Sequence, residues 1–191
     1  MTDKNELIEI RWHGRGGQGA VTSAELLAKA AINEGKYAQA FPAFGAERRG
    51  APVLAFDRVS NKVPIRVRAE ITAPNVVVVL DSSLLRVVSV TAGLKDNGTL
   101  VINSRKTLAE LEADFGRKWR LAVIDASLIA REVLGVPIVN TTMLGALLKA
   151  TGIIRPESLF EPLRERFGRL AERNIKAMER AFGETVVKES A

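Results

Sequence analysis

The sequence predicts a three-layer α/β/α protein, built on a mixed but mostly parallel β-sheet and followed by a helical C-terminal segment. Short apolar runs that are typical of strands alternate with segments of helical periodicity ahead of residue 140. The run Val76-Val77-Val78-Val79-Leu80 lacks polar alternation, which indicates a central strand covered on both faces. From Asn140 onward the pattern is helical.

The first half of the chain is expected to supply most of the strands. Residues 7–12 alternate apolar and polar side chains up to a group of glycines, which predicts the first strand. Residues 20–34 carry small apolar residues at helical spacing and end at Gly35, which predicts a helix. Further strands are expected at 37–41, 53–59, 63–67 and 76–80. The turn at 60–62 predicts that its two flanking strands form a hairpin, which makes the sheet mixed.

In the second half, strands and helices are expected to alternate until Asn140, after which only helices are expected. Asp81 is placed to cap a helix over 82–94, and Asn97-Gly98 indicates a turn into a strand at 99–103. Residues 120–124 predict one more strand ahead of a helix at 126–134. The remaining helices are expected at 141–150, capped by Asn140, at 156–167, opened by Pro156, and at 170–182.

The composition predicts one domain over residues 1–191, because 191 residues with 47% hydrophobic content can bury a substantial core. Cysteine is absent, which excludes disulfides, thiolate nucleophiles, zinc–thiolate sites and thiolate-ligated iron–sulfur clusters. Residues 1–10 lack the apolar region of a secretory signal, and no apolar run reaches membrane-spanning length. We therefore expect a cytoplasmic location and no membrane partner.

The formal net charge of +6 is spread along the chain, and the largest local excess, +3, lies in residues 41–70. Nucleic-acid binding depends on clustered Lys and Arg, so no nucleic-acid partner is expected. The sequence also lacks a Walker loop, an H-E-x-x-H motif and a G-x-S-x-G motif. We predict no catalytic residue and no metal ligand on this chain.

A glycine-rich turn, Gly14-Arg15-Gly16-Gly17-Gln18-Gly19, is the main candidate for a cofactor-binding site. Its glycines have the G-x-G-x-x-G spacing and lie between an expected strand and an expected helix. Backbone N–H groups and the helix dipole favour a phosphate or carboxylate there, and Arg15 adds positive charge. The acid that binds the ribose of a dinucleotide is missing at the end of the second strand, and Glu34 lies at the helix end instead. The turn therefore favours another phosphate-bearing ligand, or it serves packing and assembly alone.

Two other features carry weaker signals. His13, the only histidine, lies at the end of the first strand, where ligands collect in open α/β sheets. No acid or nucleophile pairs with it in the sequence, which favours a structural role over a general base. The loop at 41–52 contains Phe44, Glu47, Arg48 and Arg49, a mixture that suits either an interface or a solvated loop with internal ion pairs.

Three ordered blocks of sequence carry a family resemblance that spans nearly the whole chain. They are R-W-H-G-R-G-G-Q-G at 11–19, G-A-E-R-R-G-A-P at 45–52 and N-T-T-M-L-G at 140–145. Together they resemble the gamma subunit of pyruvate:ferredoxin oxidoreductase, in the 2-oxoacid:ferredoxin oxidoreductase family. The resemblance implies oxidative decarboxylation of a 2-oxoacid to an acyl-coenzyme A, with electrons passing to ferredoxin. The second block is more similar to the form found in enzymes that act on pyruvate. Some organisms share one gamma chain between pyruvate and branched-chain enzymes, so 2-oxoisovalerate is also a candidate substrate.

The resemblance also implies partners and cofactors. The expected partners are alpha, beta and delta subunits, with thiamine diphosphate between alpha and beta and iron–sulfur clusters on beta and delta. The chain has no cysteine and no G-D-G thiamine motif, so we expect it to carry no reacting group and to be inactive alone. It either holds coenzyme A, whose phosphates suit the glycine turn, or braces the alpha and beta chains. The rival interpretation is a stand-alone nucleotide-binding regulator on a Rossmann-like scaffold.

Overall fold

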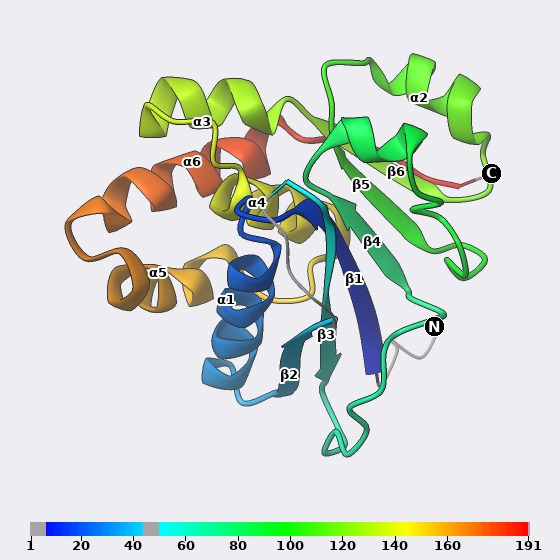
Figure 1. The fold of residues 1–191 in the computed structure, drawn as a ribbon. Helices are drawn as coiled ribbons and strands as arrows, with labels where there is room; N and C mark the ends of the chain where they lie inside the picture. Colours follow the sequence, from blue (N-terminus) through cyan, green and yellow to red (C-terminus); the bar gives the residue numbers. More distant parts are fainter. Residues whose placement is uncertain (1–6, 44–49, 191) are drawn as a thin grey trace.

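The computed structural model describes residues 7–43 and 50–190, and within them a single seven-stranded sheet forms the centre (Figure 1). Its strands lie in the spatial order β2-β3-β1-β4-β5-β6-β7. Strands β1, β4, β5 and β6 pair in parallel, β3 runs antiparallel to both β1 and β2, and β7 runs antiparallel to β6. The prediction of a mixed, mostly parallel sheet is confirmed. The strands are β1 (Leu7–Arg15), β2 (Tyr37–Pro42), β3 (Pro52–Ser60), β4 (Val76–Val79), β5 (Thr99–Asn103), β6 (Arg120–Ile124) and β7 (Val186–Lys188).

Helices lie on both sides of this sheet. Figure 1 shows α1, α4, α5 and α6 together on one side, and α2 with the short helix η1 on the other. The α-helices are α1 (Ala20–Asn33), α2 (Leu108–Phe115), α3 (Ala126–Leu134), α4 (Asn140–Thr151), α5 (Phe160–Phe167) and α6 (Ala171–Glu184), and the 3-10 helices are η1 (Ser82–Arg86), η2 (Pro156–Leu159) and η3 (Gly168–Leu170). No helix in the described part of the chain is long and apolar enough to cross a membrane.

Strand β4 separates the two main parts of the hydrophobic core. Val76 and Val78 pack in the larger cluster, with residues of α1, α4 and α6. Val77 and Val79 pack in the second cluster, with Leu84 of η1 and side chains from α2 and the segment 90–94. Successive side chains of a strand point to opposite faces, so the unbroken valine run matches a strand covered on both sides. The prediction made from 76–80 is confirmed.

A polar pair is buried inside the sheet next to the glycine turn. The Trp12 Nε1–H of β1 donates a hydrogen bond of 2.6 Å to Asp57 Oδ2 of β3, and both side chains have no exposed surface. Burial raises the pKa of the Asp57 carboxyl well above its ordinary value, although the bond from Trp12 opposes this. The pair therefore ties the antiparallel strand to the strand that leads into the turn.

Several local expectations differ from the structure, and two elements were not expected at all. Residues 63–67 form no strand, because β3 pairs with β1 and β2 instead. The expected helix at 82–94 is reduced to η1 followed by turns, in which the Arg11 guanidinium holds the Val90 and Ala92 carbonyls. Helix α2 and strand β7 were not expected. Asn140 is the first residue of α4 rather than its cap, and its Oδ1 accepts from the Thr141 N–H at 2.8 Å.

We predict that Gly145→Ala will lower the free energy of unfolding by about 3 kcal/mol, because overpacking strains a tightly packed core. A Cβ at Gly145 in α4 would lie 2.0 Å from the Met178 carbonyl oxygen of α6. The matched control is Gly183→Ala near the end of α6, where nothing lies within 4 Å of the added Cβ. That variant should be more stable by roughly 0.5–1 kcal/mol, since alanine favours a helix. Equal urea midpoints for the two variants would contradict the close approach of α4 and α6.

Candidate functional site

The glycine turn connects β1 to α1 and has much of its backbone already hydrogen-bonded. The Gly16 N–H donates to the Ala51 carbonyl, and the Gln18 N–H donates to the Arg15 carbonyl, each at 2.9 Å. The Arg15 N–H donates to Gln18 Oε1 at 2.8 Å. These three donors are engaged within the chain. A phosphate at this turn could therefore not use these three N–H groups.

Gly19, the third glycine of the motif, allows two helices to meet. It adopts a left-handed conformation with φ of 83° at the start of α1. A Cβ there would lie 2.7 Å from Asn140 Nδ2, at the start of α4. The Ser23 hydroxyl lies between the same two helices and is within hydrogen-bond distance of the Gly19 and Asn140 carbonyls. Residues 19 and 140 come from the first and third of the blocks that carry the family resemblance, and the structure brings them into contact.

Asp81, directly after β4, is bound by side chains of the glycine turn. Its Oδ2 accepts from Arg15 Nε at 3.1 Å and from Gln18 Nε2 at 2.9 Å, while its Oδ1 accepts from the Ser83 N–H at 2.9 Å. Burial raises the pKa of Asp81, but hydrogen bonds from Ser83 and Gln18 and the Arg15 charge outweigh it and hold the pKa below its ordinary value. Arg15 also donates to Ser83 Oγ and to the Gly50 carbonyl. Asp81 thus fixes the turn against the next parallel strand.

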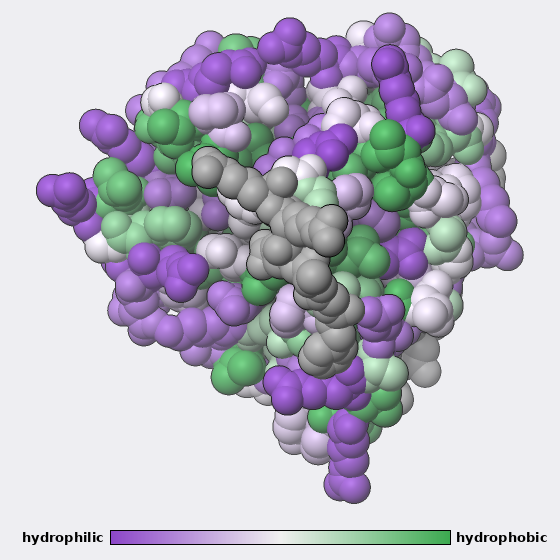
Figure 2. Space-filling view, viewed as in Figure 1, coloured by the Kyte–Doolittle hydropathy of each residue, from purple (hydrophilic) through white to green (hydrophobic). Residues whose placement is uncertain are grey.

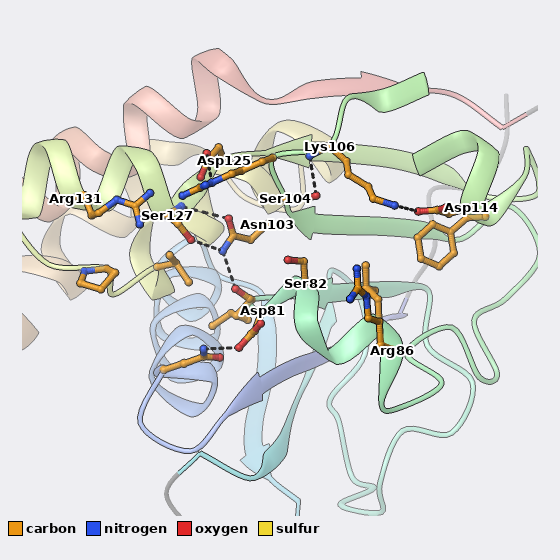
Figure 3. A pocket seen from close by; sticks show the side chains of 17 residues that line it. Asp81, Ser82, Arg86, Asn103, Ser104, Lys106, Asp114, Asp125, Ser127 and Arg131 are labelled. Carbon is orange, nitrogen blue, oxygen red and sulfur yellow. Dashed lines mark hydrogen bonds and ion pairs between the residues drawn. The ribbon is translucent and has the colours of Figure 1, made fainter. Parts of the chain in front are cut away.

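Beside Asp81 lies a pocket of about 810 Å³ at the carboxyl ends of β4, β5 and β6 (Figure 3). In open α/β sheets, ligands collect at these strand ends where the chain changes direction across the sheet. Here that change falls between β1 and β4, because the chain leaves β1 for β2 and β3 on one side and returns to β4 on the other. Gln18 belongs to both the turn and the pocket wall. The turn and the pocket therefore form one continuous site.

The pocket wall carries more unpaired positive than negative charge. Asp114 pairs with Lys106 at 2.6 Å, Asp125 pairs with Arg105 at 3.6 Å, and Asp81 pairs with Arg15. Arg86 and Arg131 also line the pocket, and neither makes an ion pair or side-chain hydrogen bond within the described residues. Figure 3 shows these two arginines on opposite sides of the pocket. The arrangement favours an anionic ligand with more than one charged group.

Asn103 holds the floor of the pocket in place. Its Nδ2 donates to the Leu80 carbonyl at 2.8 Å and contacts Ser127 Oγ at 2.9 Å, which joins β4, β5 and α3. Sequence reasoning selected none of Asn103, Arg86 and Arg131. The sequence did contain a sign of this pocket. Asn103 ends an expected strand and the polar residues 104–106 follow it directly, at a strand end where ligands collect.

The remaining residues that the sequence singled out do not line the pocket or lie outside the described residues. His13 lies inside β1, is 6% exposed, and its Nε2 accepts from Arg11 Nε at 3.0 Å, so it has a structural contact and does not line the pocket. Glu34 accepts from the Arg155 N–H at 2.7 Å and from Ser158 Oγ at 2.5 Å, which ties α1 to η2. Phe44, Glu47, Arg48 and Arg49 lie outside the described residues.

A model of the pyruvate ferredoxin/flavodoxin oxidoreductase family matches residues 9–184. The chain belongs to the pyruvate ferredoxin/flavodoxin oxidoreductase family. It is 57% identical over 185 residues to the pyruvate/ketoisovalerate oxidoreductases common subunit gamma of Thermococcus kodakarensis, covering 96% of this chain and 100% of the relative. It is 51% identical over 180 residues to the pyruvate synthase subunit PorC of Methanothermobacter thermautotrophicus, covering 93% of this chain and 96% of the relative.

Solved structures agree with this membership in the pyruvate ferredoxin/flavodoxin oxidoreductase family. The crystal structure of pyruvate oxidoreductase subunit PORC from Thermotoga maritima superposes with a TM-score of 0.86 at 37% identity, covering 97% of this chain and 100% of that chain. A 2-oxoglutarate:ferredoxin oxidoreductase from Magnetococcus marinus, with 2-oxoglutarate, coenzyme A and succinyl-CoA bound, shares the fold at a TM-score of 0.76 and 20% identity, covering 94% of this chain and 31% of that chain. The resemblance to gamma subunits and the three-layer fold are confirmed, and the findings do not support a stand-alone regulator.

We predict that the His13 ring stays neutral down to about pH 4, because burial, followed by the charge of Arg11, lowers its pKa to about 4. The unfolded chain binds this proton near pH 6.5, so folding stability should rise with pH between about 4 and 6.5, by up to roughly 3 kcal/mol. NMR titration of this single histidine tests the pKa directly. His13→Asn should remove the corresponding part of the pH dependence of urea unfolding, and a ring that titrates near pH 6.5 would contradict the assignment.

Proposed function

We propose that this chain is the gamma subunit of an enzyme that oxidises pyruvate to acetyl-coenzyme A and passes the electrons to ferredoxin. The proposal rests on the 57% identity, along the whole length of the relative, to a gamma subunit common to pyruvate and ketoisovalerate oxidoreductases. That relative serves two oxidoreductases, so 2-oxoisovalerate is a second candidate substrate. In this proposal residues 1–191 act as one domain, in the cytoplasm.

The partners in this proposal are alpha, beta and delta subunits, which carry the thiamine diphosphate and the iron–sulfur clusters. A chain without cysteine has no thiolate for such clusters, which supports a subunit that is inactive alone. The loop with Phe44, Glu47, Arg48 and Arg49 is proposed as an interface. Its support is the bond from Arg15 Nη1 to the Gly50 carbonyl at 3.0 Å, which fastens the end of this loop to the glycine turn.

Coenzyme A is the proposed ligand of the site formed by Gly14, Arg15, Gly16, Gly17, Gln18 and Gly19 with the adjoining pocket. Bound coenzyme A supplies the thiol that takes up the acyl group. Arg86 and Arg131 fit its phosphates because both line the pocket without an ion pair in the described chain. The turn forms one edge of the proposed site. The hydrogen bond from Gln18 to Asp81 fixes this edge to the pocket wall, which also contains both arginines.

We expect tagged chain from the native cell to purify with a thiamine-binding chain and a cluster-binding chain, and the complex to reduce ferredoxin when given pyruvate and coenzyme A. The double variant Arg48→Glu/Arg49→Glu should weaken this assembly more than it weakens folding, because it reverses two charges in the proposed interface. Thermal unfolding of the variant alone is the control. A chain that purifies alone would contradict the gamma-subunit role, and unchanged co-purification of the variant would contradict the interface.

The coenzyme A proposal predicts that Arg86→Gln and Arg131→Gln will each raise the KM for coenzyme A by about tenfold, the loss expected for one charge-assisted contact. The KM for pyruvate should stay unchanged. Arg173→Gln is the matched control, since this exposed α6 arginine lies away from the pocket wall. A crystal of the complex soaked with coenzyme A that shows the cofactor remote from Gly16, Gly19 and both arginines would overturn the proposal.

A further inference from the structure

Residues 63–70, Val-Pro-Ile-Arg-Val-Arg-Ala-Glu, form a segment with the pattern of a strand but without a strand partner among the described residues. They follow β3 at the end of the molecule opposite the glycine turn, toward the bottom of Figure 1. The register of β1 with β3 places Ser60 opposite Leu7 there, while Pro52 lies opposite Arg15 at the turn end. We call residues 63–70 the docking segment.

The Arg58 side chain anchors the docking segment, in which residues 64–68 contain no bend or turn. Its guanidinium donates to the Val67 carbonyl at 3.0 Å and to the Ala69 carbonyl at 2.8 Å. Glu9 of β1 pairs with Arg58 at 3.0 Å, and Arg58 is 5% exposed, so this anchor is fixed. Successive carbonyls of an unbent chain point to opposite sides, and within residues 64–68 it is the Val67 carbonyl that faces Arg58. The backbone groups of residues 66 and 68 therefore point away from the anchor.

The outward edge of this segment is unpaired. None of the backbone N–H groups from Ile65 to Glu70 donates a hydrogen bond within the described chain. Unpaired backbone groups on an extended segment form a template for another strand. The anchor keeps this template ordered, which lowers the entropic cost of pairing.

The side chains of the segment combine apolar and basic groups. Val63 and Val67 are 46% and 58% exposed, and with Leu7 and Ile65 they line a hollow of about 320 Å³. Arg66 and Arg68 make no ion pair within the described residues. At the lower end of Figure 2, hydrophilic residues project beside hydrophobic ones. Such a surface fits a polypeptide that brings apolar side chains and negative charge together.

We propose that the docking segment pairs, strand to strand, with an extended acidic segment of a neighbouring subunit in the assembled enzyme. Backbone hydrogen bonds to residues 66 and 68 supply the pairing, apolar partner side chains enter the hollow, and partner carboxylates meet Arg66 and Arg68. The observations favour protein over nucleic acid because exposed valines alternate with the arginines. That the neighbour is an oxidoreductase subunit rests on the proposed function.

Hydrogen–deuterium exchange of the free chain and of the purified complex tests this pairing. The amides of residues 66 and 68 should exchange rapidly in the free chain and about tenfold or more slowly in the complex, because hydrogen-bonded amides exchange only when the structure opens. Equally fast exchange in both samples would overturn the docking proposal while leaving the gamma-subunit role intact. A chain that forms no complex at all would instead overturn the gamma-subunit role on which the partner depends.

Two further measurements identify the occupant. Arg66→Glu/Arg68→Glu should release the chain from the complex at lower salt than wild type, with unchanged thermal stability alone. Arg173→Glu/Lys176→Glu on α6 makes the same change in charge and should leave the salt profile unchanged. Protection of residues 65–70 that already exists in the free chain and disappears when residues 2–6 are deleted would assign the site to the chain's own N-terminus. Protection conferred by DNA or RNA but not by the complex would assign it to nucleic acid, and either result would overturn the proposal.

Discussion

The close burial of α4 is the constraint on which the rest of the structure depends. Ten of its residues, Asn140 to Leu148 and Ala150, are buried, and it packs against α1, α6 and the sheet. A helix enclosed on this scale needs small residues where other backbones approach, which explains Gly19 opposite Asn140 and Gly145 opposite Met178. Thr141, in its first turn, is buried with a partner, since its hydroxyl donates to Asn174 Oδ1 at 2.9 Å. Two motifs 121 residues apart in the sequence thus meet for a packing reason.

The packing of α1 against α4 also determines where the candidate site lies. Because Gly19 allows α1 to start against α4, the glycine turn is held at the carboxyl edge of β1, beside the parallel strand β4. Asp81 follows β4 at the same edge, which brings it within 3.1 Å of Arg15 and 2.9 Å of Gln18. The carboxyl ends of β5 and β6 extend this edge into the pocket. Helix packing and the position of the candidate site are therefore consequences of the same arrangement.

The features that the sequence predicted well are those set by local patterns. The valine run of β4 and the glycine that ends α1 follow from periodicity and backbone preference. Residues 63–67 have an equally clear strand pattern, yet they form no strand in this chain, because pairing needs a neighbour that no local pattern supplies. The pocket arginines come from two elements, η1 and α3, whose approach depends on the order of the strands. Tertiary proximity of this kind could not be predicted from spacing alone.

The occupied donors of Arg15 change the interpretation of the glycine motif. Its Nε contacts Asp81, its Nη1 the Gly50 carbonyl and its Nη2 Ser83, so the charge that the sequence offered to a phosphate is used to close the turn. In the proposed site an anion depends instead on Arg86 and Arg131, which line the pocket on opposite sides. Two separated cations suit a ligand with phosphates some distance apart better than a single phosphate held on a helix N-terminus. A ribose-binding acid at the end of β2 would not border the turn, because β3 lies between β1 and β2 in this sheet. Glu34, the acid at the end of α1, is bound to Ser158 and the Arg155 N–H. In this structure the glycine motif closes the turn and lets α1 approach α4, and the proposed anion recognition lies at the neighbouring strand ends.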